Sequence, residues 1–239
     1  MPGQQLSLDE TVIRTFGQIV SKAARYGIKI YVLTDAETAF VLKVIIYTGK
    51  YTYQESANQR DKKTVQVVKQ LCQHLRGTHR TVYVDRFYTS LDLVKDLRVM
   101  DLYVTGTIMK NRIPKELTIP KSSKQYQEMK WGDFKSHEYQ YKEGDETRRM
   151  GLVCWKDRDI VYCLTNETNT TEASKCKRRT KDGLITIARP KVVGEYNRFM
   201  GCVDLADMRR LHCSSTIMGQ NRWWLKLFFI CWMLEHQRH

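Results

Sequence analysis

Runs of apolar, strand-forming residues alternate with helix-like segments over the first hundred positions. Alternating apolar and polar residues at 6–10 are typical of a strand end. Apolar runs with β-branched and aromatic residues predict strands at 28–34, 40–47, 81–84 and 102–106. Apolar residues at helical spacing predict a helix over 62–76 that ends at Gly77, and Ser90 stands where it can cap a second helix. This alternation predicts an α/β or α+β fold with a mixed sheet.

The pattern changes after residue 110. The lysine-rich segment 111–150 has no long apolar period and predicts an insertion of loops and short strands. Two apolar runs at 152–155 and 160–164 predict a hairpin. Segment 175–191 holds seven basic residues and one acid, which favours a solvated loop or tail. The alternative is that this run contacts phosphates or serves as an import signal.

The last part of the chain is predicted to be helical. Residues 192–200 and 203–212 form two helical pieces separated by Gly201. The aromatic-rich segment 221–239 predicts a final amphipathic helix, too short and too charged to span a membrane.

Composition indicates a soluble, basic protein. The 239 residues include 40 Lys and Arg against 26 Asp and Glu, a net charge of +14, and 42% are hydrophobic, enough for a sizeable core. Such a surplus points to a polyanion, usually nucleic acid, although a merely basic soluble protein has the same composition. The N-terminus has no signal-peptide pattern, and the seven scattered cysteines include no CxxC pair, so we expect a reduced, intracellular protein without a zinc finger.

Acidic residues stand at the ends of predicted elements. Asp35 and Asp85 each follow an apolar strand, Asp204 begins a helix, and Asp207 lies one turn further on. Strand ends can meet at one edge of a sheet, where closely spaced carboxylates need a cation to offset their repulsion. Pairs of Mg²⁺ ions are held in this way in phosphoryl-transfer sites. The alternative is that these acids cap elements or lie on the surface without any catalytic role.

Around these acids the sequence resembles the catalytic region of piggyBac transposases. The resemblance covers roughly residues 6–226. The segments that carry it are Leu8–Glu10, Tyr26–Ile30, Tyr47–Lys50, Val84–Ser90, Gly106–Pro114, Gly201–Asp207 and Asn221–Trp223. The stretch 16–22 is shorter than the corresponding family segment, and the N-terminal DNA-binding region and the cysteine-rich C-terminus of the family have no counterpart in this sequence.

The resemblance implies an RNase H-like fold, a mixed five-stranded sheet with flanking helices that is interrupted by an insertion domain. On this basis the first part of the core is expected at 1–110, the insertion at 111–190 and the last part at 191–239, in a truncated or alternative product of a longer gene. The family's aspartate triad falls on Asp35, Asp85 and Asp204, which would hold two Mg²⁺ ions, with Mn²⁺ able to substitute. Asp207 is an additional ligand candidate.

The resemblance also implies DNA cleavage and strand transfer at TTAA-type sites, in the nucleus, on double-stranded DNA, with a possible homodimer and with no membrane or small-molecule partner. The candidate DNA contacts, chosen for charge and for base stacking, are Lys177, Arg178, Arg179, Arg222 and Trp223. The competing hypotheses are a domesticated, catalytically inactive DNA- or chromatin-binding protein and a protein-interaction scaffold on an inactive fold.

Overall fold

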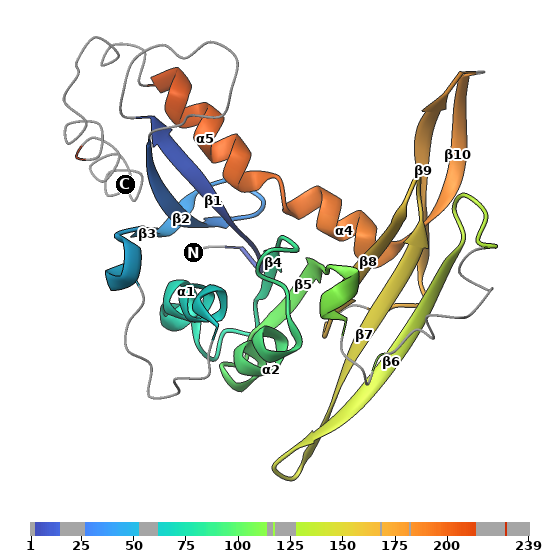
Figure 1. The fold of residues 1–239 in the computed structure, drawn as a ribbon, viewed down its shortest axis with the longest axis horizontal. Coiled ribbons are helices and arrows are strands. Elements are labelled where there is room, and N and C mark those ends of the chain that lie inside the picture. The colour runs from blue at the N-terminus through green and yellow to red at the C-terminus, as the bar shows by residue number, and fades with distance from the viewer. Residues whose placement is uncertain are drawn as a thin grey trace. The chain divides into compact units, whose positions relative to one another are not determined.

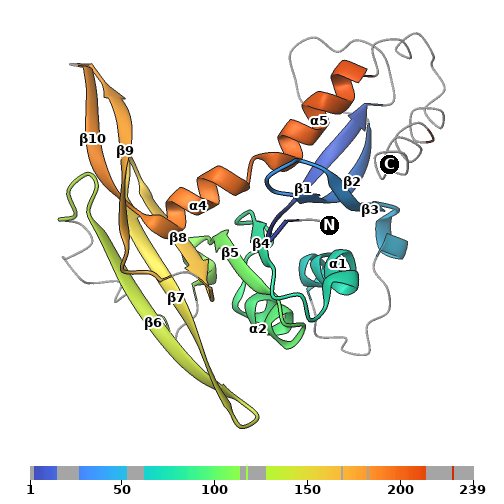
Figure 2. The ribbon, with the colours of Figure 1, turned by 180° about the vertical axis from the view of Figure 1, so that it is seen from behind.

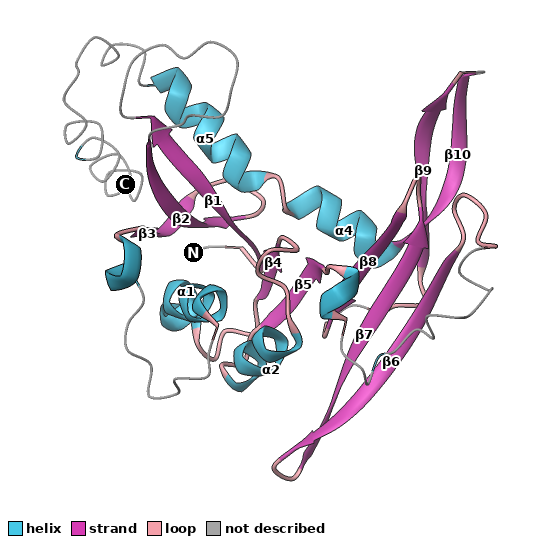
Figure 3. Cartoon of the chain, in the orientation of Figure 1, coloured by secondary structure: helices cyan, strands magenta, loops and turns pink. Residues whose placement is uncertain are grey.

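The chain forms two compact units. The computed structural model describes residues 3–14, 27–52, 62–113, 117, 128–167, 169–181, 183–213 and 228. Unit 1 comprises Met1–Leu75 and Phe199–His239, and unit 2 comprises Arg76–Arg198. Figures 1 and 2 show the ribbon from opposite sides, and Figure 3 marks its helices and strands. The two ends of the chain therefore contribute to the same unit.

Unit 1 contains an antiparallel sheet in the order β3-β2-β1. The strands are β1 (Gln5–Arg14), β2 (Gly27–Asp35) and β3 (Val41–Ile46), and a short 3₁₀ helix, η1 (Gly49–Thr52), follows. The register pairs Leu6 with Asp35, so the last residue of β2 lies beside the start of β1.

Helices cover both faces of this sheet. The helix α1 (Lys63–Cys72), which continues into η2 (Gln73–Leu75), lies on the face of Lys43, whose Nζ donates to the carbonyl of Gln70 at 2.7 Å. The helix α5 (Cys202–Cys213) packs against β1 and β2, and its Val203 joins the core of Ile30 and Val32. Because Lys43 pairs with Leu33, and successive residues of a strand point to opposite faces, α1 and α5 lie on opposite sides.

Unit 2 begins with a parallel βαβ motif. It consists of β4 (Thr81–Val84), α2 (Leu91–Val99) and β5 (Tyr103–Thr107). The hydroxyl of Ser90 accepts from the backbone N–H of Leu93 at 3.2 Å and so caps α2. After η3 (Lys110–Arg112), three antiparallel strands extend the sheet in the order β4-β5-β8-β7-β6: β6 (Phe134–Glu143), β7 (Glu146–Lys156) and β8 (Ile160–Thr165).

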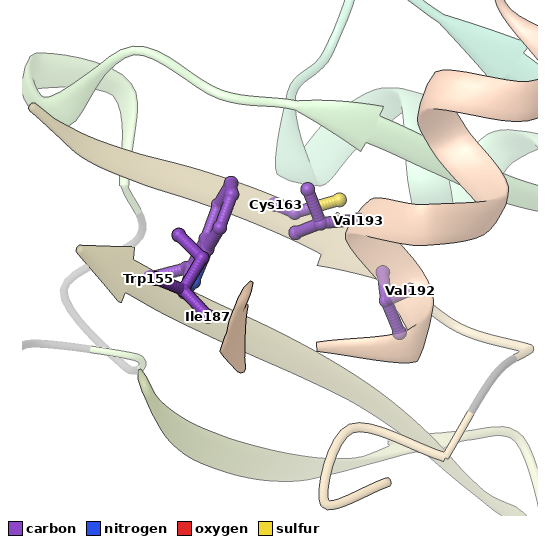
Figure 4. Close-up of a cluster of buried hydrophobic side chains, with 5 residues drawn as sticks. All are labelled: Trp155, Cys163, Ile187, Val192 and Val193. Carbon is purple, nitrogen blue, oxygen red and sulfur yellow. The ribbon is translucent and has the colours of Figure 1, made fainter. Parts of the chain in front are cut away.

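A second, two-stranded sheet packs against β7. It is an antiparallel ribbon of β9 (Ala173–Thr180) and β10 (Gly183–Pro190), followed by α4 (Lys191–Phe199). Figure 4 shows the cluster beneath it, formed by Trp155, Cys163, Ile187, Val192 and Val193. The indole Nε1 of Trp155 also donates to the carbonyl of Ala188 at 3.0 Å. This bond and the cluster determine which face of the ribbon packs against β7.

An ion pair holds the same side of the ribbon. Arg178 Nε and Nη2 donate to the two carboxylate oxygens of Asp157, each at 3.1 Å, and the guanidinium lies 5.6 Å from the ring centre of Trp155. Trp131 Nε1 donates to the same carboxylate at 3.0 Å. Burial raises the pKa of Asp157, but the bonds from Arg178 and Trp131 outweigh that effect and leave it below its ordinary value.

The predicted mixed α/β fold is confirmed, and so are the strands and helices expected over residues 6–10 and 28–106, the hairpin of β7 and β8, and the two helices on either side of Gly201. Two predictions are wrong. Segment 111–150 contains two of the longest strands, β6 and β7, and segment 175–191 is the ribbon instead of a loop. Both segments are rich in lysine and arginine, whose long polar side chains hide a strand pattern from hydropathy.

The helix predicted over 221–239 lies outside the described residues except at Phe228, which is helical. The domain boundaries at 110 and 190 stay a prediction. Among the described helices, none is long and apolar enough to cross a membrane.

We expect Arg178→Gln to lower the free energy of unfolding by about 1 kcal/mol at pH 7, because it removes a two-point ion pair that is largely shielded from solvent. The contribution is fully present above the ordinary pKa of an aspartate and is lost as the pH falls through the lower pKa of folded Asp157. Denaturant unfolding at several pH values should show a difference between the two proteins that is constant from pH 5 to 8 and shrinks toward pH 3.

The matched control is Lys191→Gln, which breaks the Lys191–Glu172 pair, whose side chains are 48% and 46% exposed. Exposed pairs contribute little, so its effect should stay within about 0.5 kcal/mol. Equal effects of the two substitutions would show that the Arg178 pair is not what fixes the ribbon.

Candidate active site

Asp35 is a buried carboxylate that organises its own turn. The residue is 3% exposed. Its Oδ1 accepts from the backbone N–H groups of Glu37 and Thr38, each at 2.9 Å, and from the hydroxyl of Thr38 at 3.0 Å. Its Oδ2 accepts from the backbone N–H of Gly3. The turn that follows β2 is therefore folded around this side chain.

These bonds keep Asp35 ionised. Burial alone raises the pKa of the carboxyl group, but the donors of Thr38, Gly3 and Glu37 together lower it below the ordinary value. The thiol of Cys202 lies close enough for the negative charge of Asp35 to raise the pKa of that thiol, in addition to the effect of its burial. The structure thus supplies a charged, oriented carboxylate at the end of β2.

The helix that carries Asp204 is fastened to the turn that carries Asp35. Cys202 Sγ donates to the carbonyl of Ala36 at 2.8 Å, and Arg209 Nη1 donates to the carbonyl of Thr38 at 2.5 Å. Cys202 and Arg209 are seven residues apart, two helical turns, so both lie on one face of α5. Two aspartates that the sequence separates by more than 160 residues are thereby placed on elements in direct contact.

Asp204 itself is exposed, in the first turn of α5, and Asp207 is half-buried. The carboxylate of Asp204 has no hydrogen bond or ion pair with another described residue. Its position in the helix is on the side away from Cys202 and Val203, which pack against the sheet. The side chain is therefore available to a ligand.

Asp85 follows β4 in unit 2 and begins a tight turn. Its backbone carbonyl accepts from the N–H groups of Tyr88 and Thr89 at 3.0 and 3.1 Å, and its Oδ1 accepts from the N–H of Arg86 at 2.6 Å. Arg112 Nη1 donates to the carbonyls of Phe87 and Arg86 at 2.7 and 3.2 Å. The side chain from η3 thus braces the turn that presents Asp85.

Gly106 allows this turn to lie close to β5. A Cβ atom at this position would stand 2.3 Å from Thr89 Oγ1 and 2.6 Å from the backbone oxygen of Val84. Real Cβ atoms do not approach backbone oxygens so closely. The glycine is therefore required by close packing behind the Asp85 turn.

The structure brings Asp35 and Asp204 onto contacting elements of unit 1, whereas Asp85 belongs to unit 2. The meeting of all three carboxylates, like the additional role of Asp207, stays a prediction. Among the described residues no three His, Cys, Asp or Glu side chains already stand together as a metal site.

The donor chemistry fits a hard divalent cation. Asp35 Oδ2 carries one hydrogen bond, Asp85 carries one on Oδ1, and Asp204 carries none from described residues. Each carboxylate therefore keeps an oxygen that can bind a cation, and oxygen is the ligand that Mg²⁺ and Mn²⁺ prefer.

The candidate DNA contacts fall into separate groups. Lys177 and Arg179 are exposed on β9, while Arg178 between them is half-buried and bound to Asp157. Arg222 and Trp223 lie outside the described residues.

Three residues with defined positions were not foreseen: Arg112 and Arg209, which brace the aspartate-bearing turns, and Lys175, which shares the exposed face of Lys177. Only Lys175 had a signal in the sequence, the two-residue spacing of the cations.

Comparison with known proteins assigns this chain to a protein family. The family model described as transposase IS4 matches residues 1–234. The chain belongs to this transposase family. It is also similar in fold to the piggyBac transposase in a cryo-EM structure of its synaptic complex with hairpin DNA, with a TM-score of 0.64 and 24% sequence identity. The match covers 95% of this chain and 44% of the length of that transposase chain.

We expect Gly106→Ala to destabilise the protein by about 1–3 kcal/mol, because the new methyl group overlaps Thr89 and the backbone of Val84, and neither can move without disturbing the Asp85 turn. Thermal unfolding of the purified chain measures the loss as a fall in Tm.

Gly201→Ala is the control, since a Cβ at residue 201 meets nothing within 4 Å. Its effect should stay within about 0.5 kcal/mol. A Gly106→Ala protein as stable as Gly201→Ala would mean that the close packing behind Asp85 is not required.

Proposed function

We propose that the chain is the catalytic core of a piggyBac-like transposase, in which Asp35, Asp85 and Asp204 form the active site for DNA cleavage and strand transfer. The observation that carries this proposal is the attachment of α5 to the Asp35 turn through Cys202 and Arg209. It places two of the three aspartates, which are distant in sequence, on elements in direct contact.

The fold of this core is proposed to be RNase H-like. Support comes from the three antiparallel strands of unit 1, the parallel βαβ motif of unit 2, and the likeness to piggyBac transposase. In this arrangement two of the aspartates follow strands and the third begins a helix, which gives each carboxylate a rigid support.

Each of the three aspartates is held in place by a different part of the structure. The hydrogen bonds of the turn after β2 favour the ionised form of Asp35. Arg112 fixes the backbone of the turn that carries Asp85, and Asp204 is exposed on α5. When bound, divalent cations supply Lewis-acid activation and charge neutralisation at the reacting phosphate. Mg²⁺ is the proposed ion and Mn²⁺ its substitute, with Asp207 as a further ligand.

The proposed substrate is double-stranded DNA, with TTAA-type target sites, and the proposed location is the nucleus. The net charge of +14 supports a DNA partner, because cationic surfaces gain affinity by releasing the counterions of the phosphates. The similar piggyBac structure is a synaptic complex with hairpin DNA. A homodimer belongs to this proposal.

An alternative function is a domesticated DNA- or chromatin-binding protein without catalysis. One observation favours it: the cations of β9 stand on a ribbon of their own, with no acidic residue in either of its strands. DNA binding through that ribbon needs none of the three aspartates.

Asp204→Asn is the sharpest test of the catalytic proposal. Because Asp204 is exposed and without a described partner, its substitution should leave the Tm unchanged while excision of a reporter transposon in cells falls at least about 100-fold. Asp35→Ala is less informative, since it also removes the acceptor around which the turn folds.

Asp145→Asn, an exposed acid in the turn between β6 and β7, is the control with the same change of charge and should excise normally. Excision by Asp204→Asn at the wild-type level would remove the proposed role of Asp204. A wild-type chain that binds DNA without excision would support the non-catalytic alternative.

A further inference from the structure

The exposed face of the β9–β10 ribbon carries a row of cations. Lys175, Lys177 and Arg179 alternate along β9 with less exposed residues, so their side chains share the face that points away from unit 2's core. Their partners across the ribbon are Ala188, Thr186 and Leu184. All three partners are exposed and uncharged, so the face holds no acid that would neutralise the row.

The opposite face is fixed against the core. Cys176 packs on the cluster of Trp155 and Ile187, and Arg178 is bound to Asp157. Because a strand turns alternate residues to opposite sides, these contacts determine where Lys175, Lys177 and Arg179 point. The row of cations is therefore a consequence of packing and is oriented before any ligand binds.

The three cations repel one another. Residues two apart in a strand are separated by roughly 6.6 Å, less than the ~8 Å over which physiological salt screens a charge. Their side chains have no hydrogen bond or ion pair with another described residue. A row of this kind lowers its free energy when an extended polyanion lies along it.

We propose that this face binds the sugar–phosphate backbone of one strand of duplex DNA, with Lys175, Lys177 and Arg179 as phosphate contacts and Arg178 as the anchor of the ribbon. The choice of DNA as the polyanion rests on the proposed transposase function. The row is about 13 Å long, and each DNA strand presents one phosphate per ~3.4 Å of helix axis, so the row can lie beside about four phosphates. Such contacts position DNA without reading its sequence.

The test is the salt dependence of DNA binding by the full chain. A fluorescently labelled 30-base-pair duplex of arbitrary sequence is titrated by anisotropy at several KCl concentrations. In the triple variant Lys175→Gln, Lys177→Gln, Arg179→Gln, the slope of log K against log salt should become shallower by about 2.7, and affinity near 0.1 M KCl should fall roughly 10- to 100-fold.

A scattered triple variant separates the row from net charge. Lys130, Lys142 and Arg158 are exposed residues of the same unit that form no row, and their replacement by Gln removes the same three charges. This variant should lose less than one unit of slope.

Two results would overturn the assignment: wild-type binding by the row variant, or an equal loss in the scattered variant. Tighter binding to an RNA duplex of the same sequence would overturn the choice of DNA. Failure of the catalytic proposal is distinguished by Asp204→Asn, which concerns excision and leaves the salt slope unchanged.

Discussion

The contact between α5 and the turn after β2 is the constraint on which the candidate site depends. The carboxylate of Asp35 gathers the N–H groups of Glu37 and Thr38, and this leaves the carbonyls of Ala36 and Thr38 facing the helix. Cys202 and Arg209 then donate to those carbonyls. The side chain of Asp35 therefore determines the shape of the turn after β2, and that turn determines where α5 packs.

Several donors around a buried carboxylate favour its anionic form, because hydrogen bonds to a charged acceptor are stronger than those to a neutral carboxyl group. Asp35 thus has a structural duty and a proposed chemical one. Asp204 is exposed and has no hydrogen bond or ion pair within the described part of the chain, so its proposed role is chemical. The two acids differ in what they contribute to folding, although the sequence gives them similar positions at the ends of elements.

Strands and helices of the first hundred residues were predictable because their apolar residues follow the period of the element that they form. The two segments predicted wrongly share a different property. In β9 the inward positions are held by Ser174, Cys176 and Arg178, none of which stands out in hydropathy. Arg178 faces the core side because its guanidinium donates to Asp157 and lies over the ring of Trp155. Both partners are distant in sequence.

For the candidate site, the sequence and its resemblance indicated which acids matter but not how they are held. Asp35, Asp85 and Asp204 could be named from their positions and motifs. The roles of Arg209 and Arg112 could not, since each donates to backbone carbonyls far along the chain, and a carbonyl leaves no mark in a sequence. The same holds for Gly106, whose requirement is visible only against Thr89.

Unit 1 is discontinuous in the chain, and this has a consequence for the order of synthesis. The hydroxyl of Ser7 donates to the carbonyl of Met200, a bond between residues 193 positions apart. During translation the strands β1 to β3 are made first, and the face that α5 will cover stays open until all of Arg76–Arg198 has been made. At ~5–20 residues per second the synthesis of these residues takes roughly 6 to 25 seconds, long enough for unit 2 to fold first. The first-made unit is then completed last, and the apolar face of Ile30 and Val32 lacks its cover in the nascent chain until α5 has been made.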